Sequence, residues 1–298
     1  MKSAAVVQER MARAKVALEG LSTGDAFGEQ LLHAGPHARA TAVSDRRHPS
    51  ATPWRWTDDT AMAISIVEVL EGHAGIDEEE LARRFAARYV AERARGYGRG
   101  AHQVLEEIHQ GTPYREAAQR LFGGQGSCGN GGGMRSAPIG AYFADALPAV
   151  VVHAARSAVP THAHPDGAAG AVAIAVAAAR TFAGERDPHA LIEAVLGHTP
   201  PGPTRDGLRR ALDLLGAEPI TAATELGNGS RVTSADTVPF AVWCAASHLT
   251  DYSAALWACA SVGGDIDTTC AMVGGVVVGA LGVGGIPAAW RAAREPLA

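Results

Sequence analysis

Residues 56–67 have the sequence Trp-Thr-Asp-Asp-Thr-Ala-Met-Ala-Ile-Ser-Ile-Val, in which an acidic pair leads straight into an apolar run. Thr57 is a favourable N-cap, because its hydroxyl can accept a hydrogen bond from a free N–H of the first helical turn. Asp58 and Asp59 then occupy that turn, where the helix dipole stabilises negative charge by about 0.3–1 kcal/mol. Adjacent carboxylates also repel each other, so the stretch predicts either a plain acidic cap or a site for a cation or a proton.

The composition restricts the class of protein. Of 298 residues, 47% are hydrophobic but only 5% are aromatic, so the core must consist mainly of Ala, Val, Leu and Ile. The net charge of −5 argues against general nucleic-acid binding, which needs a basic surface. A local site for a small anionic ligand is still compatible with this charge.

The cysteines and the N-terminus bear on the compartment. The four cysteines, Cys128, Cys244, Cys259 and Cys270, show neither a CxxC spacing nor a disulfide-rich pattern. The first fifteen residues contain too many charges for a signal peptide. No apolar run reaches the roughly 18–20 residues that span a bilayer without a charge or proline. We therefore expect a cytoplasmic protein with no membrane segment.

Helical periodicity dominates the chain, and almost no segment alternates as a β-strand would. We expect a first helix over residues 3–21, a segment at 20–29 in which Gly24 and Gly28 let the backbone turn around Asp25, and a long loop over 33–53. The prediction is an all-α protein with one compact multi-helix domain over residues 1–298. Further helices are expected at 57–72, 78–95, 101–109, 114–121, 134–144, 148–158, 166–181, 188–196, 204–215, 235–248, 252–260 and 268–281.

A second acidic motif, Gly264-Asp265-Ile266-Asp267-Thr268, precedes an almost wholly apolar helix. In an extended segment the side chains of Asp265 and Asp267 would point the same way. Burying them without a partner would be very costly, so they stay in solvent or bind cations. Taken with residues 57–59 the motif supplies only oxygen donors, which suit Mg²⁺, Mn²⁺ or Ca²⁺ better than zinc. Four carboxylates in one pocket could balance two divalent ions.

Two further segments are candidates for ligand binding. Residues 123–133 form a glycine-rich loop ahead of Met134 and Arg135, and its N–H groups could bind an anion at a helix start. The loop matches neither a P-loop nor a dinucleotide fingerprint. In Thr161-His162-Ala163-His164, the histidines could cap a helix, contact a ligand or, less readily, bind zinc. The alternative is a proline-initiated helix with surface histidines.

Five motifs together resemble the ADP-ribosylglycohydrolase family, in order and in spacing. They span most of the chain, and five in order are far more specific than any one alone. The matching segments are Gly24-Asp25-Ala26-Phe27-Gly28, Trp56-Thr57-Asp58-Asp59-Thr60, Gly129-Asn130-Gly131 through Met134-Arg135, Thr161-His162-Ala163-His164 and Gly263-Gly264-Asp265-Ile266-Asp267-Thr268.

The resemblance implies an all-α fold with a binuclear Mg²⁺ or Mn²⁺ centre. The implied metal ligands are Thr57, Asp58, Asp59, Asp265, Asp267 and Thr268. The implied ligand-binding residues are Gly129, Asn130 and Gly131, which would hold the diphosphate or distal ribose, together with Met134, His162 and Asp25.

The chain departs from the family at one position. Many members carry a gating glutamate about four residues after the second glycine of the first motif, and Leu32 stands there in this chain. The nearest glutamate, Glu29, directly follows Gly28 and joins Asp58 and Asp59 as a candidate catalytic residue. The acceptor pocket is expected in the loops at 39–55 and 97–100.

The resemblance implies an enzyme that hydrolyses the bond between ADP-ribose and an acceptor, with ADP-ribose or an ADP-ribosylated acceptor as its partner. In this hypothesis a carboxylate near the metals, Asp58 or Asp59, accepts the proton of the attacking water. Two alternatives stay open, a non-catalytic ADP-ribose-binding protein and a metal-dependent phosphohydrolase acting on an ADP-ribose derivative.

Overall fold

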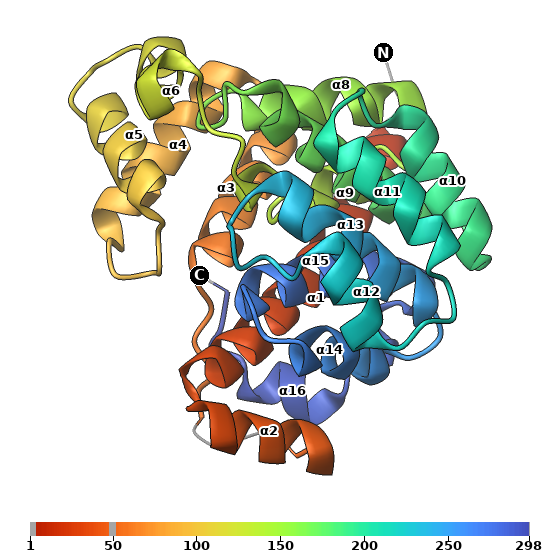
Figure 1. The fold of residues 1–298 in the computed structure, drawn as a ribbon. Helices are drawn as coiled ribbons and strands as arrows, with labels where there is room; N and C mark the ends of the chain where they lie inside the picture. Colours follow the sequence, from red (N-terminus) through yellow and green to blue (C-terminus); the bar gives the residue numbers. More distant parts are fainter. Residues whose placement is uncertain (1–3, 48–51, 298) are drawn as a thin grey trace.

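The computed structural model describes residues 4–47 and 52–297 (Figure 1). In these ranges every regular element is a helix, and the only β-type pairings are isolated bridges between Trp54 and Arg294 and between Gly129 and Thr233. The all-α prediction is confirmed. No helix in the described ranges has the length and apolarity needed to cross a membrane.

The α-helices fill most of the described ranges, and two short 3₁₀-helices lie among them. In order they are α1 (Ala4–His33), α2 (Pro36–Asp45), α3 (Asp58–His73), α4 (Glu78–Ala91), α5 (Arg99–His109), α6 (Tyr114–Gly124), η1 (Asn130–Gly132), α7 (Ala137–Tyr142), α8 (Leu147–Ala158), α9 (Pro165–Phe182), α10 (Pro188–His198), α11 (Pro203–Asp213), α12 (Pro219–Leu226), α13 (Ser234–Ser247), α14 (Tyr252–Ser261), α15 (Ile266–Leu281), η2 (Val283–Gly285) and α16 (Ala288–Ala293).

Helices α1 and α15 pack against each other through the middle of the molecule, with α1 in red and α15 in blue in Figure 1. Glycines at one-turn intervals on α1 make the contact close. A Cβ added to Gly24 would stand 2.2 Å from the carbonyl oxygen of Cys270, and one added to Gly28 would stand 2.6 Å from the Cα of Asp267. The residues contacted run backwards along α15 as α1 advances, so the two helices are antiparallel.

This contact corrects the expected end of the first helix. The segment around Asp25, predicted to turn, lies inside α1, which continues to His33. Gly24 and Gly28 have no positive φ and are helical. The packing that they permit offsets the roughly 1 kcal/mol by which glycine weakens a helix relative to alanine.

Other differences concern short helices. The expected loop at 33–53 contains α2, although its residues 48–51 lie outside the described part of the chain. Helices α12 and α16 were not predicted, and only α7 occupies the stretch expected to be helical over 134–144. Helix α2 has a weak apolar pattern of its own, and its buried Ala42 packs on the core. Tertiary packing, rather than sequence periodicity, stabilises such elements.

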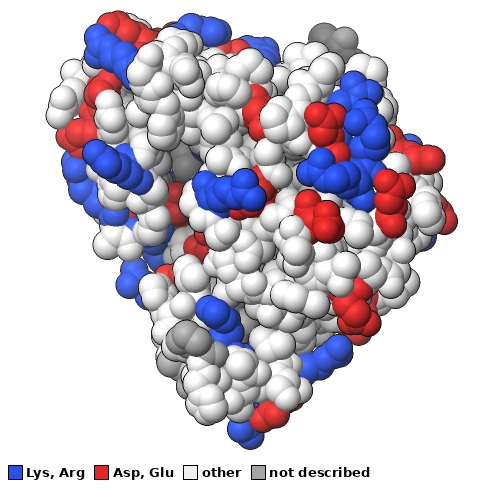
Figure 2. Space-filling view, in the orientation of Figure 1, with Lys and Arg blue, Asp and Glu red and all other residues white. Residues whose placement is uncertain are grey.

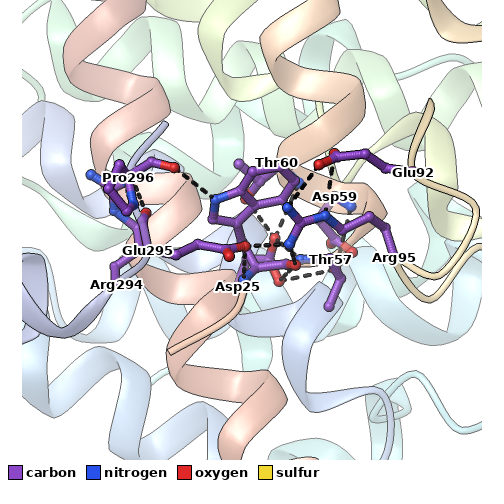
Figure 3. Close-up of polar contacts among 10 residues, drawn as sticks. Asp25, Thr57, Asp59, Thr60, Glu92, Arg95, Arg294, Glu295 and Pro296 are labelled. Carbon is purple, nitrogen blue, oxygen red and sulfur yellow. Dashed lines mark hydrogen bonds and ion pairs between the residues drawn. The ribbon is translucent and has the colours of Figure 1, made fainter. Parts of the chain in front are cut away.

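The segment that leads into α3 is fixed by the C-terminal residues (Figure 3). Glu295 accepts a hydrogen bond from the Trp56 N–H at 3.2 Å and forms an ion pair with Arg95. The Arg95 guanidinium also lies 3.5 Å from the centre of the Trp56 ring, a cation–π contact. Glu295 and Arg95 therefore both fix the position of Trp56, just before α3 begins.

Candidate active site

The N-terminus of α3 has the predicted cap. Thr57 is extended, and its hydroxyl oxygen lies 3.4 Å from the Asp59 N–H, which donates to it. The same hydroxyl lies 2.9 Å from Asp25 Oδ1 and 2.9 Å from Asp59 Oδ2. A hydroxyl has only one hydrogen to donate, so both contacts are satisfied together when one of the two carboxyls carries a proton.

Asp25 anchors the start of α3 from within α1. Its carboxylate accepts hydrogen bonds from the backbone N–H of Thr57 at 2.9 Å and of Thr60 at 3.1 Å, and from the Thr60 hydroxyl at 2.5 Å (Figure 3). Asp25 is completely buried. Its oxygens therefore face donors from α3, which fixes the position of the acidic pair.

The second acidic motif begins α15 and is not extended, which corrects the expected geometry. Asp265 occupies the N-cap position, and Asp267 and Thr268 lie in the first turn. Gly264, at φ +80°, makes the sharp entry, and a Cβ there would stand 2.0 Å from the carbonyl oxygen of Asn228. The Thr268 hydroxyl lies 3.5 Å from Asp59 Oδ2, so the two helix starts meet.

The carboxyls at this junction raise one another's pKa values. Burial is the largest cause for each, and repulsion from neighbouring aspartates adds to it at Asp58, Asp59 and Asp267. The pKa of Asp58 rises to about 8 and that of Asp25 to about 6, although hydrogen bonds from Thr57 and Thr60 partly counter the second rise. Asp59 and Asp267 have pKa values well above the ordinary range, and the pKa of Asp265 is raised as well. None of these five carboxyls forms an ion pair within the described residues, and the charge of Arg135 only partly counters the rise in the pKa of Asp58.

The donor set fits a hard cation. Asp59 Oδ1 and Asp267 Oδ1 are buried oxygens with no hydrogen-bond partner, although an unpaired buried acceptor costs about 1–3 kcal/mol. As the side chains stand, no group of three or more His, Cys, Asp or Glu residues in the described ranges is arranged to hold a metal ion. The oxygens would have to move closer together around one. Carboxylate and hydroxyl oxygens are what Mg²⁺ and Mn²⁺ prefer.

A cavity of about 450 Å³ opens over this cluster. Figure 2 shows a hollow left of centre, with acidic side chains visible inside it and basic ones on the surrounding surface. Nine predicted site residues line the cavity, namely Asp58, Asp265, Asp267, Thr268, Gly129, Asn130, Gly131, Met134 and His162. Thr57, Asp59 and Asp25 are buried beside it. Glu29 lies on the last turns of α1, 3.0 Å from His33 Nε2, and near enough to Asp267 to raise its pKa.

The glycine loop reaches the cavity differently from the prediction. It does not open a helix at Met134; it passes through the turn η1, and α7 begins only at Ala137. The Asn130 side chain donates a hydrogen bond to Asp265 Oδ2 at 2.7 Å and another to the Thr237 hydroxyl at 3.1 Å. Asn130 therefore orients a carboxylate of the cluster. His164 caps α9 by accepting from the Asp166 N–H, as one interpretation of the histidine pair predicted.

Sequence reasoning missed one wall and the rim of the cavity. The segment 227–233 packs on the α15 entry, where the Asp265 N–H donates to the Asn228 carbonyl oxygen at 3.2 Å. Its Asn228-Gly229-Ser230 turn signature could have indicated this loop. Val232 and Phe122 both line the cavity, at φ values of +57° and +52°, and are 55% and 66% exposed. No periodicity points to such positions.

A larger groove of about 970 Å³ lies elsewhere, between the end of α2 and helices α12 to α14. Its lining includes Arg46, His189 and His248 but none of the clustered aspartates. The chemistry-bearing residues therefore gather in the smaller cavity, which we take as the candidate active site.

Known proteins resemble this chain over most of its length. The family model described as ADP-ribosylglycohydrolase matches residues 7–296. The chain belongs to the ADP-ribosylglycohydrolase family. It is 31% identical to "ADP-ribosylhydrolase ARH3" of Bos taurus over 274 residues, which cover 80% of this chain and 74% of that protein. The human protein of the same name is 30% identical, with the same coverage.

A solved structure shows the same fold. The chain named "ADP-ribosylglycohydrolase-related protein complex" superposes with a TM-score of 0.67 at 24% identity, covering 97% of this chain and 94% of that one. The family resemblance inferred from the five motifs is thus confirmed.

Proposed function

We propose that this member of the ADP-ribosylglycohydrolase family hydrolyses the glycosidic bond between C1″ of ADP-ribose and an acceptor, with Mg²⁺ or Mn²⁺ at the aspartate cluster. The observation that carries the proposal is one cavity that joins both acidic helix starts, the glycine loop and His162. Thr57, Asp58, Asp59, Asp265, Asp267 and Thr268 would hold the ions. Bound divalent ions would orient the ribose hydroxyls and make water more acidic.

Asp58 is the preferred proton acceptor among the carboxylates. It lines the cavity, whereas Asp59 is almost completely buried and engaged with Thr57. In the proposed reaction the oxygen of water bonds to C1″ as the bond from C1″ to the acceptor breaks. The proton that Asp58 takes from the water then leaves with the acceptor. A role for Glu29 stays a prediction.

The rim suits the remainder of the ligand. Phe122 and Val232 offer apolar surface at the mouth of the cavity, against which an adenine base could pack. The loop at Gly129–Gly131 offers backbone next to His162, where oxygen atoms of the diphosphate or ribose could approach. Gly98, Arg99 and Gly100 also line the cavity and form the proposed start of the acceptor pocket.

The test is a panel of ADP-ribosyl-arginine, ADP-ribosyl-serine and ADP-ribose-1″-phosphate, each assayed in Mg²⁺, in Mn²⁺ and in EDTA. We expect free ADP-ribose from ADP-ribosyl-arginine or ADP-ribosyl-serine, and none in EDTA. Asp267→Ala should lower turnover by more than about 100-fold, since even residues that only support metal ligands cost 10–100-fold. Asp206→Ala is the control, because Asp206 is exposed and its one ion pair in the described part of the chain is with Arg209 on α11.

The same panel separates the alternatives. A phosphohydrolase would release inorganic phosphate from ADP-ribose-1″-phosphate but no free ADP-ribose from ADP-ribosyl-arginine or ADP-ribosyl-serine. Tight ADP-ribose binding with no turnover on any substrate would identify a binding protein. Wild-type turnover by Asp267→Ala in EDTA would contradict the role of the metal cluster.

A further inference from the structure

Arg135 is a fully buried cation beneath the cavity. Its guanidinium lies 4.4 Å from the centre of the Phe85 ring, and Nη2 donates to the Ser157 carbonyl oxygen at 3.0 Å and to the Thr161 hydroxyl oxygen at 2.7 Å. No carboxylate in the described ranges lies within ion-pair distance of it. Burying a charged guanidinium is costly unless it is paired with an opposite charge, and the hydrogen bonds of Arg135 go to neutral groups.

The Thr161 hydroxyl connects Arg135 to His162, because its oxygen also lies 2.8 Å from His162 Nδ1. A guanidinium can only donate, so the hydroxyl oxygen accepts from Arg135. In the described part of the chain the hydroxyl has no further hydrogen-bond partner, and Thr161 is buried. Its own hydrogen is therefore satisfied only by pointing at Nδ1.

This arrangement determines which nitrogen of His162 carries hydrogen. When Nδ1 accepts, a neutral imidazole must carry its single hydrogen on Nε2. Burial and then the nearby charge of Arg135 lower the pKa of His162 to about 3, so the ring is neutral at pH 7. A second hydrogen, on Nδ1, would have to displace the hydroxyl hydrogen that points there.

Nε2 is directed at the glycine loop. A Cβ added to Gly131 would stand 3.1 Å from Nε2, and one added to Gly129 would stand 3.2 Å from it. His162 itself lines the cavity together with these glycines. The N–H of Nε2 is thus presented where a ligand lying along the loop would pass.

We propose that Thr161, held by Arg135, fixes His162 as the Nε2–H tautomer and makes it a permanent hydrogen-bond donor to an oxygen of the bound ligand. Arg135 and Thr161 are then positioning residues that act through His162. The ring does not shuttle protons in the reaction, because Nε2 already carries its hydrogen and Nδ1 is occupied. That the oxygen belongs to ADP-ribose rests on the proposed function, whereas the tautomer does not.

The tautomer can be observed directly in the wild-type protein. Two-bond ¹⁵N–¹H correlation spectra of protein labelled with ¹⁵N-histidine distinguish Nε2–H from Nδ1–H rings, and the His162 signals among the 12 histidines are those lost in His162→Gln. At pH 7 we expect a neutral Nε2–H ring. A ring with hydrogen on Nδ1, or on both nitrogens, would overturn the proposal whether or not the protein has hydrolase activity.

The threonine is tested by an isosteric change. Thr161→Val removes the hydroxyl, so the Nδ1–H form should appear in the spectrum and ADP-ribose should bind about tenfold more weakly, the worth of one hydrogen bond. Thr161→Ser should keep both wild-type properties. Thr199→Val is the matched control, because Thr199 is equally buried but its hydroxyl bonds only the Val195 carbonyl oxygen among the residues described.

The outcomes are distinct. An unchanged tautomer with unchanged ADP-ribose affinity in folded Thr161→Val would overturn the proposal, as would a Thr161→Ser protein that behaves like the valine variant. If ADP-ribose does not bind the wild-type protein at all, the proposed function fails, and the spectra of the wild-type and valine proteins still decide the tautomer.

Discussion

Asp25 illustrates how one buried side chain can organise a site without facing the cavity. Its carboxylate faces the N–H and hydroxyl groups of both Thr57 and Thr60, so it fixes the start of α3 relative to α1. Burial raises its pKa, and those four donors lower it again, to about 6. The acidic pair that follows Thr57 is therefore placed by a hydrogen-bond network built on a third aspartate. Such an arrangement favours a structural role for Asp25 over direct contact with a ligand.

Asp25→Asn should destabilise the protein by about 1–3 kcal/mol, because the amide nitrogen would meet donors and leave a buried N–H or hydroxyl unpaired. Loss of one negative charge from the cluster offsets only part of this cost. Urea unfolding in EDTA measures the change. Asp251→Asn is the control, since Asp251 is an exposed N-cap that accepts from the Ala254 N–H and asparagine caps equally well. Equal stability of both variants would contradict the anchoring role.

At the scale of elements, the α1–α15 contact brings the two acidic helix starts together. Gly24 lets α1 approach the backbone of α15 at Cys270, and Gly28 lets it approach Asp267 itself. The position of Asp267 thus depends on the absence of a side chain one helix away. The same two glycines belong to the motif that carried the family resemblance, and the structure explains them by helix packing instead of a turn.

Gly24→Ala should destabilise the protein by about 1–3 kcal/mol or more, since the added methyl would overlap backbone atoms that cannot move aside independently. The control is Gly72→Ala in α3, where an added Cβ meets no atom within 4 Å. Gly72→Ala should gain up to about 1 kcal/mol from helix propensity. Thermal unfolding of both variants measures the difference, and stabilisation by Gly24→Ala would disprove the close contact.

At the scale of the whole molecule, the aspartate cluster brings carboxylates from three helices, α1, α3 and α15, close enough to repel one another when they are charged. Unfolding exposes the carboxyls to water and returns their pKa values to about 4. At Asp58 the folded state therefore holds the proton more tightly than the unfolded state, until the pH rises through about 8. Stability from these groups is fully present only below the unfolded pKa and is lost as the pH rises through the folded values.

In EDTA, the protein should become more stable as the pH falls from 8.5 to 6.5. The gain should be at least about 1 kcal/mol, or some 2 °C in Tm for a chain of this size. Below pH 6.5 the lowered pKa of His162 opposes the trend, because that ring stays neutral in the folded state. Differential scanning calorimetry across this range measures the slope.

Two comparisons locate the source of that slope. Saturating Mg²⁺ should flatten it, because the ion binds the deprotonated carboxylates and stabilises the folded state at the alkaline end. Asp58→Asn should flatten it in EDTA, whereas Asp206→Asn, on an exposed surface, should leave it unchanged. A slope of the opposite sign in EDTA would show that the aspartates are not held in mutual repulsion.

Much of this architecture could be predicted from the sequence. The start of α3 at Thr57, the proline-initiated α9 and the apolar α15 follow from caps and periodicity that act within a few residues. The five motifs placed the chain in its family. The extent of α1, the existence of α2 and the helical start of Asp265–Thr268 could not be predicted, because each depends on packing against a distant element.

The helical class, the family and the presence of two acidic helix starts could all be predicted from residue order, since they depend on local propensity and on patterns of residue type. Three relations became visible only in the folded chain: Asp25 anchors α3, Asn130 orients Asp265, and Arg135 is linked to His162 through Thr161. Those relations join residues separated by up to 135 positions, and a hydrogen bond requires atoms within about 3 Å. No local pattern specifies such a distance.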